Sequence, residues 1–166
     1  MDDLNHPKVK PFTREIASEL AIDPTFVDFV FAEQRPECFR YWVEDVAGGW
    51  TCYVPDGFDV AYPLWCTNAD QTLILVKNSM ASFGKGWHDN PNMEMISETT
   101  QGLLTYLMNQ IAESGVPDDE LRQAAKFCGY RFVDDLLAFI DGPEPEGTSW
   151  SEAMGQFIAG VDAKSK

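Results

Sequence analysis

Cys66 and His88 are the two residues best suited by type to covalent chemistry. A thiol becomes a nucleophile when a nearby base or cation lowers its pKa, and histidine is the usual base at neutral pH. Asn68 or Asp70 would then orient the imidazole ring. This combination describes a Cys-dependent hydrolase or transferase. Against it, Cys66 belongs to an apolar run, where a packed thiol is commoner than a reactive one.

Metal chemistry has a weaker signal. His88 is the one histidine outside the N-terminal tail, and its acidic neighbours lack the fixed spacing of a metal-ligand motif: Asp89, Glu94 and Glu98. Asp56 precedes Gly57, a pair that is typical of a turn rather than of two cooperating carboxylates. The sequence therefore predicts no catalytic residues, no metal and no cofactor.

A surface that binds another protein is a further alternative, although most aromatic side chains of the strand region are expected to lie in the core. Aromatic side chains often anchor such surfaces, and a rim of acids selects a basic partner. The predicted anchors are Trp65 and Trp87. The polar members of the predicted partner-binding set are Asp56, Asp59, Asp70, His88 and Asp89. Residues 118–120, all acidic, would add a more distant steering field.

The overall charge agrees with that preference. Twenty-seven acidic residues against twelve basic ones leave a formal net charge of −15 over 166 residues. Such a field repels nucleic acid and anionic membrane surfaces, and it accelerates encounter with a basic protein. An acidic surface that serves only solubility is the plainer interpretation of the same numbers.

The N-terminal sequence and the cysteines indicate a compartment. The first ten residues, MDDLNHPKVK, lack the apolar core of a secretory signal, and no stretch of 18 apolar residues occurs. The four cysteines form no CxxC pair and fit free, mostly packed thiols. We therefore expect a cytoplasmic protein.

Capping residues and apolar spacing predict the helices. Thr13 caps a short first helix, and Asp23 with Pro24 begins a second, very apolar one. Leucine, methionine and isoleucine at helical spacing over residues 103–111 predict the clearest helix. Further helices are expected at 118–128, 132–140 and after Ser149, which forms a capping box with Glu152.

The middle of the chain predicts strands. Residues 39–76 are aromatic and β-branched runs broken by turn residues, as in an antiparallel meander. Residues 73–76 are all apolar, which predicts a central strand. Asn78 and Ser79 would turn the chain into a further strand at 80–83, and residues 68–70 would form a tight polar turn whose acid faces a partner.

This order of elements indicates the fold class. Helices, then strands, then helices are typical of an α+β domain rather than of alternating βαβ units. We expect a single domain with an antiparallel sheet of mixed-length strands, flanked by N-terminal and C-terminal helices. The expected boundaries are a flexible tail at 1–12, the α+β domain at 13–141, and a linker with a C-terminal helix at 142–166.

Two stretches together resemble a known family. They are YPLWCTNADQTLILVK, which begins at Tyr62, and SETTQGLLTYLMNQIAES, which begins at Ser97. Their pattern of a Pro-Leu step, a polar knot, a buried strand and an amphipathic helix is similar to the SUKH superfamily, or SMI1/KNR4-like proteins, over about residues 40–140. Gly48 and Gly49 before Trp50 are similar to a glycine pair in that family.

The resemblance implies an α+β fold without catalytic residues. Many bacterial members are immunity proteins that neutralise toxins, and fungal members are regulatory scaffolds. We therefore expect a non-catalytic protein that binds and occludes a basic toxin or regulatory target, as a monomer or homodimer. The alternatives are the Cys66 and His88 enzyme and an assembly protein that dimerises through Trp150 and Phe157.

Overall fold

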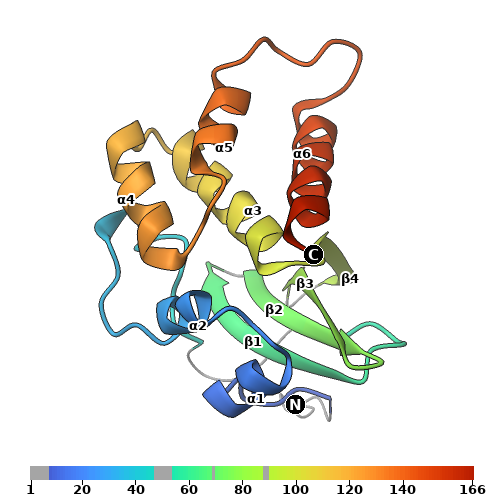
Figure 1. Ribbon diagram of the computed structural model, residues 1–166. Coiled ribbons are helices and arrows are strands. Elements are labelled where there is room, and N and C mark those ends of the chain that lie inside the picture. Colours follow the sequence, from blue (N-terminus) through green and yellow to red (C-terminus); the bar gives the residue numbers. More distant parts are fainter. Residues whose placement is uncertain (1–7, 47–53, 69, 88–89) are drawn as a thin grey trace.

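The computed structural model describes residues 8–46, 54–68, 70–87 and 90–166, which form one α+β domain (Figure 1). The N-terminal part contains α1 (Arg14–Glu19), α2 (Pro24–Val30) and the 3₁₀ helix η1 (Glu37–Phe39). Four strands follow: β1 (Val60–Thr67), β2 (Asp70–Lys77), β3 (Met80–Trp87) and β4 (Asn90–Ser97). The C-terminal helices are α3 (Thr100–Glu113), α4 (Asp118–Cys128), α5 (Val133–Ile140) and α6 (Trp150–Ser165). The predicted fold class is confirmed.

The four strands form an antiparallel sheet in the order β1-β2-β3-β4. β2 lies inside the sheet, as its apolar run predicts. Asn78 and Ser79 connect β2 to β3 with φ values of 51° and 63°, the left-handed geometry of a tight hairpin turn. Asn68, just after β1, also has a left-handed φ of 53°, whereas Asp70, which was predicted to lie in the turn, is the first residue of β2.

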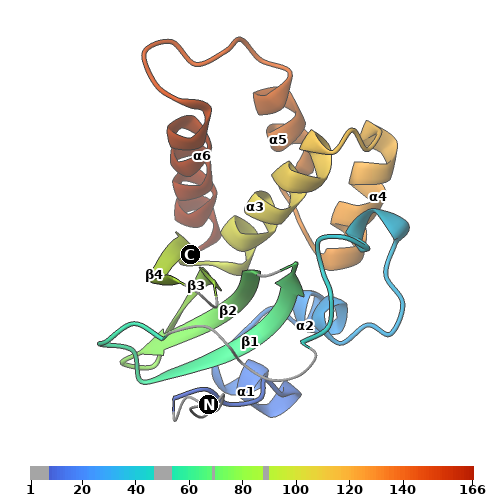
Figure 2. The ribbon, with the colours of Figure 1, turned by 180° about the vertical axis from the view of Figure 1, so that it is seen from behind.

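The helices pack on one face of this sheet. Phe26 of α2 and Leu104 of α3 are fully buried there against Ile74 and Phe83 of the inner strands. Figure 2 views the molecule from behind, with the other face of the sheet toward the reader. Within the described residues, this face carries no helix. A small apolar cluster lies on it instead: Val54, Ala61, Leu73 and Leu75.

Two backbone bridges cover the outer edge of β1. Lys10 donates its amide hydrogen to the Ala61 carbonyl at 3.0 Å, and Glu44 donates to the Cys66 carbonyl at 2.9 Å. Pro63 lies between these bridges and has no amide hydrogen to offer. The bridges hold the segments before α1 and after η1 against the sheet, which sets the position of η1.

Local capping signals account for the helix ends. The side chain of Thr13 accepts from the Ile16 amide at the start of α1, and that of Asp23 accepts from the Thr25 and Phe26 amides at the start of α2. Gly129 ends α4 with a φ of 80°. Ser149 and Glu152 form the predicted capping box of α6. The caps predicted at Thr13, Asp23 and Ser149 are confirmed, because each depends on a few adjacent residues.

The strand boundaries differ from those predicted. Phe39 belongs to η1, and the first strand begins at Val60; residues 47–53 lie outside the described part of the chain. β4, which contains Pro91, was not predicted, and β3 extends to Trp87. β4 is an edge strand with two irregularities in its pairing to β3, and such a strand tolerates proline.

Asp162 of α6 joins the last helix to the start of α3. Its buried carboxylate accepts from the Ser97 hydroxyl at 2.8 Å, the Glu98 amide at 2.9 Å and the Thr99 hydroxyl at 2.6 Å. α6 also buries Met154 and Ile158 in the same core as the sheet. The C-terminal helix is therefore an integral part of the domain rather than an appendage.

We expect Gly102→Ala to lower the free energy of unfolding by about 1–3 kcal/mol, because overpacking forces buried groups apart. The added Cβ would lie 2.1 Å from Ser97 Oγ and 2.3 Å from Asp162 Oδ1. Gly155→Ala on α6 is the matched control, since an added Cβ there would have no atom within 4 Å other than those of its chain neighbours and the nearby backbone of α6. The control should gain about 0.5–1 kcal/mol from helix propensity. Urea unfolding followed by circular dichroism measures both, and a gain in both variants would contradict the tight junction.

Candidate functional site

A buried ion pair lies at the end of the sheet where β2 begins. Lys85 Nζ is 2.7 Å from Asp70 Oδ2 and 3.3 Å from the Tyr106 hydroxyl of α3. The two charged side chains are 11% and 22% exposed. The rings of Trp87 and Tyr106 each lie 5.7 Å from the ammonium. These four residues are called the Lys85 cluster below.

The Lys85 cluster holds a lysine that stays protonated at neutral pH. Burial lowers the pKa of Lys85, but the hydrogen bonds and charges of Asp70 and Tyr106 outweigh it, so the pKa is raised overall. Burial raises the pKa of Tyr106. A protonated ammonium is neither a nucleophile nor a base. The expectation that Asp70 faces a partner is corrected, because its carboxylate faces Lys85.

The three cysteines that the structure describes have raised thiol pKa values, the opposite of activation. Burial raises the pKa of Cys66, although a hydrogen bond from the Gln71 side chain acts in the opposite direction. Burial also raises the pKa of Cys38, and that of Cys128 to about 12. A reactive cysteine needs a lowered pKa. His88 lies outside the described residues, so its pairing with Cys66 stays a prediction.

The predicted acidic rim does not form one surface. Asp59 donates its amide to the Val76 carbonyl, and its carboxylate accepts from the Asn78 amide, which places it at the β2–β3 turn. Asp70 lies at the opposite end of β2, about 23 Å away at the usual rise of a strand. Asp56 is exposed and lies near the end of the sheet that holds Asp59. Trp87 is half-buried and pairs with Asp70 at the other end of the sheet. His88 and Asp89 lie outside the described residues.

Trp65 is part of the core, which corrects its predicted role as an exposed anchor. It is 3% exposed, and its ring lies 6.2 Å from Phe26 and 5.9 Å from Phe29. An irregularity in β1 between Pro63 and Trp65 breaks the alternation of side chains. Consecutive Leu64 and Trp65 are both buried in the core under the helices for this reason.

Exposed aromatic and acidic residues flank the contact between η1 and α4, and we call this set the η1–α4 face. Tyr41 is 69% exposed just after η1, and Phe127 of α4 is 39% exposed. The rings of Phe39 and Phe127 lie 6.4 Å apart, which joins the two elements. Exposed Glu37 and Glu120 come from η1 and α4. Besides burial, the charges of both carboxylates raise the pKa of Cys38, so both lie close to that thiol.

Sequence reasoning missed the η1–α4 face. It assigned the start of the meander to residue 39, so Tyr41 was expected to lie in a strand, and α4 was expected to contribute only its acids. The signal that was present is the Arg40-Tyr41 pair after a buried phenylalanine. Arg40 lies over the Tyr41 ring at 5.5 Å and pairs with Glu37 at 3.1 Å.

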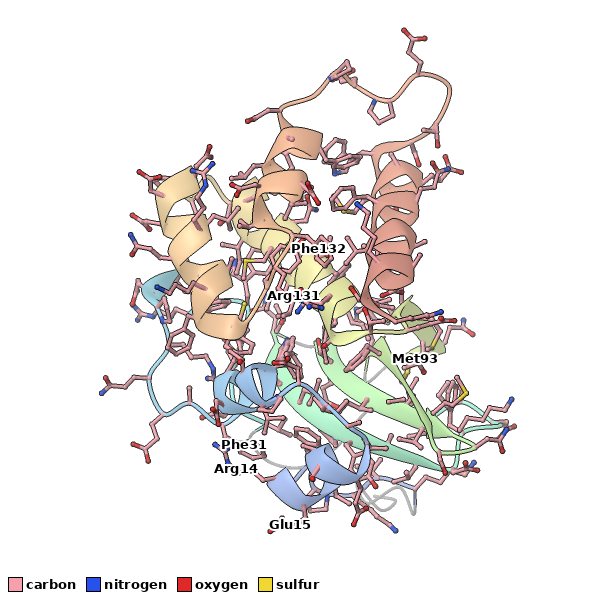
Figure 3. The ribbon with its side chains drawn as sticks, viewed as in Figure 1. Arg14, Glu15, Phe31, Met93, Arg131 and Phe132 are labelled. Carbon is pink, nitrogen blue, oxygen red and sulfur yellow. The ribbon has the colours of Figure 1, made fainter. Side chains whose placement is uncertain are left out.

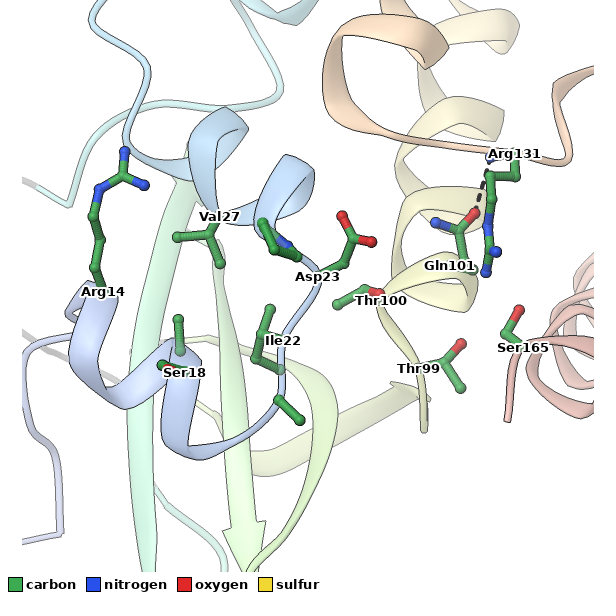
Figure 4. A pocket seen from close by; sticks show the side chains of 13 residues that line it. Arg14, Ser18, Ile22, Asp23, Val27, Thr99, Thr100, Gln101, Arg131 and Ser165 are labelled. Atoms are coloured by element: carbon green, nitrogen blue, oxygen red, sulfur yellow. Dashed lines mark hydrogen bonds between the residues drawn. The ribbon is translucent and has the colours of Figure 1, made fainter.

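A cavity of about 690 Å³ lies between the N-terminal helices and the starts of α3 and α5. Figure 3 shows Arg14 and Phe31 together on the N-terminal side, whereas Arg131 and Phe132 lie beside α3. Figure 4 shows the cavity from close by, with Arg14 and Arg131 on opposite sides. Its lining mixes apolar residues with Arg14, Ser18 and Asp23 on the N-terminal side, and it is polar beside α3. Cavities of this size accept small molecules.

Comparison with known proteins identifies no relative of the chain. No family model, curated protein or solved structure matches it. The resemblance to SMI1/KNR4-like proteins therefore stays a prediction from the residues. Within the described part of the chain, no helix is long and apolar enough to span a membrane, and no three His, Cys, Asp or Glu side chains are grouped to hold a metal ion.

We expect Lys85→Met to lower the free energy of unfolding by about 1–3 kcal/mol, because Asp70 would keep a partly buried charge without its partner. Arg40→Met is the matched control, since it removes an ion pair whose side chains are both largely exposed. Its effect should stay below about 0.5 kcal/mol. Urea unfolding measures both, and equal losses would show that the Lys85 cluster is no stronger than a surface pair.

We expect iodoacetamide to label Cys66 more slowly in the folded chain than in urea, with the difference measured by mass spectrometry of the Cys66 peptide. Burial raises the pKa of the folded thiol, so at neutral pH less of it is thiolate than in the unfolded chain. The folded labelling rate should therefore rise at a higher pH than the unfolded rate. A folded rate that reaches its plateau below neutral pH would instead support an activated nucleophile.

Proposed function

We propose that this chain is a non-catalytic protein-binding module that captures a basic protein and occludes its working surface. The net charge of −15 supports a basic partner, because opposite charge accelerates encounter. The raised pKa values of Cys66 and Lys85 support a role without covalent chemistry. Direct binding to nucleic acid or to an anionic membrane is not part of the proposal.

The observation that carries the proposal is the composition of the η1–α4 face. Tyr41 is the most exposed aromatic residue of the described chain, and Phe127 is held beside η1 by its contacts with the core. Exposed aromatic side chains are common anchors of protein interfaces, and acidic neighbours such as Glu37 and Glu120 select a basic partner. This face therefore replaces the tryptophan-centred rim as the proposed contact surface.

The resemblance to SMI1/KNR4-like proteins supplies the partner class. A toxin that the module neutralises is the leading candidate, and a regulatory target is the other. Both candidates place the module in the cytoplasm. Inhibition by occlusion requires only a rigid surface with the right charge, which is compatible with a main core shared by the sheet and the helices.

Assembly through α6 has less support. Trp150 donates its indole hydrogen to Glu113 at 3.0 Å, and the rings of Phe157 and Phe139 lie 4.8 Å apart. These aromatic side chains are thus engaged within the chain. A homodimer that uses them would have to exchange those internal contacts for contacts with a second copy.

A photo-cross-linking residue at position 41 should capture one basic protein from an extract of the native host. Tyr41→p-benzoylphenylalanine places the probe on the η1–α4 face, and Met80→p-benzoylphenylalanine is the matched control. Met80 is 75% exposed at the β2–β3 turn, beside the Asp59 end of the sheet. Capture through position 80 alone would reject the η1–α4 face and favour the Asp56 and Asp59 surface.

The captured protein then allows a quantitative test with purified components. Tyr41→Ala should raise its Kd at least about tenfold, whereas Met80→Ala should leave it unchanged. Glu37→Lys combined with Glu120→Lys should slow association and flatten its salt dependence, with a smaller effect on dissociation. Unchanged association rates would remove the electrostatic part of the proposal, and catalytic turnover of the captured protein would overturn the whole of it.

A further inference from the structure

Arg131 differs from the other four arginines of the chain. Those four have a carboxylate oxygen between 2.6 and 3.5 Å away: Arg14 with Asp28, Arg35 with Asp45, Arg40 with Glu37, and Arg122 with Asp119 and Asp134. In the described residues, no carboxylate lies at such a distance from Arg131; its guanidinium carbon is 6.0 Å from the Phe132 ring centre. An arginine without an acid is unusual in a chain with 27 acidic residues.

The backbone of Arg131 is held firmly beside α3. Its amide donates to Gln101 Oε1 at 2.9 Å, and Gln101 Nε2 donates to the Gly129 carbonyl at 2.8 Å. Gln101 is buried, so these hydrogen bonds are protected from water. The side chain of Arg131 extends from this fixed point along Gln101 toward Ser165 (Figure 4). These bonds fix the backbone from which the exposed Arg131 side chain reaches the cavity.

The cavity that Arg131 lines has two kinds of wall. Ala17, Ile22 and Val27 supply apolar surface from α1, α2 and the turn between them, interspersed with polar residues such as Ser18. Thr100 and Ser165 lie on the other, polar side with Arg131. The volume of about 690 Å³ exceeds what a simple inorganic ion needs. These walls suit a molecule with an apolar body and one polar head group.

The charges around the cavity set the charge of that head group. Arg14, on the opposite side, is engaged by Asp28 at 2.6 Å, so Arg131 is the available cation of the lining. Asp23 also lines the cavity, and its Oδ1 accepts from the Thr25 and Phe26 amides. A second negative charge on a ligand would meet this carboxylate. One anionic group is therefore favoured over two.

We propose that the cavity binds a small organic carboxylate with an apolar body, and that the carboxylate pairs with Arg131. The planar guanidinium matches a carboxylate with two parallel hydrogen bonds. The apolar body lies against the wall from α1 and α2. This site shares no residue with the η1–α4 face, so a result that contradicts one proposal leaves the other unaffected.

Nuclear magnetic resonance of the ¹⁵N-labelled full chain tests the site with hexanoate as the probe. Each of the five arginines contributes one Nε–H signal, and Arg131→Gln identifies the signal of Arg131 by its loss. Hexanoate should shift that signal saturably and leave the signals of Arg40 and Arg122 in place. Hexanol, which keeps the apolar body without the charge, and adipate, which adds a second carboxylate, should both bind more weakly.

Variants complete the test, with binding followed through the backbone amides of Gly129 and Ser165. Arg131→Gln should weaken hexanoate binding at least about tenfold, because a charge-assisted hydrogen bond is lost. Arg131→Lys should retain part of the affinity, and Arg40→Gln, a matched loss of one charge elsewhere, should retain all of it. Absence of a saturable shift, or equal binding by wild type and Arg131→Gln, would overturn the proposal.

Discussion

Phe26 and Phe29 of α2 fill the space between the sheet and the C-terminal helices, and their burial holds the molecule together. The ring of Phe26 lies 6.2 Å from Trp65 and 6.3 Å from Phe83, which are on different strands. Phe29 reaches in the other direction, to Phe39 of η1 at 4.9 Å and to Phe127 of α4 at 6.3 Å. Rings of this size provide much of the apolar burial in a small domain. Both the η1–α4 face and the cavity beside α2 depend on this packing.

Buried polar groups then fix how the elements meet around that apolar core. Asp162 joins α6 to the start of α3, Gln101 joins α3 to the loop before α5, and Lys85 joins the sheet to α3 through Tyr106. Apolar contacts alone tolerate sliding of one element over another. A buried polar group that loses its partners costs free energy, so these links select one arrangement.

The two proposed sites use this rigidity in different ways. The η1–α4 face exposes part of the aromatic cluster, so its anchors are held from below by core residues such as Phe39. The cavity holds a guanidinium whose backbone is tied to a buried side chain. In both places the tertiary structure fixes residues beside the functional group before binding, which reduces the entropy lost when a ligand or partner binds.

The amino-acid sequence by itself determined the features that depend on neighbouring residues. Thr13, Asp23 and Ser149 cap helices through amides two or three residues away, and Gly129 ends one through its own left-handed conformation. The all-apolar stretch of β2 indicated an inner strand for a similarly local reason. The α+β class followed from the order of such elements.

Only the tertiary structure decided which side chains are buried and which distant residues meet. Trp65 is in the core because β1 departs from regular alternation, and Asp70 is paired because β3 brings Lys85 beside it. The separation of Asp59 from Asp70 follows from the hairpin register. Arg131 reaches its cavity because the loop before α5 returns to α2 and α3. These outcomes arise from contacts between residues far apart in the chain, which local spacing does not encode.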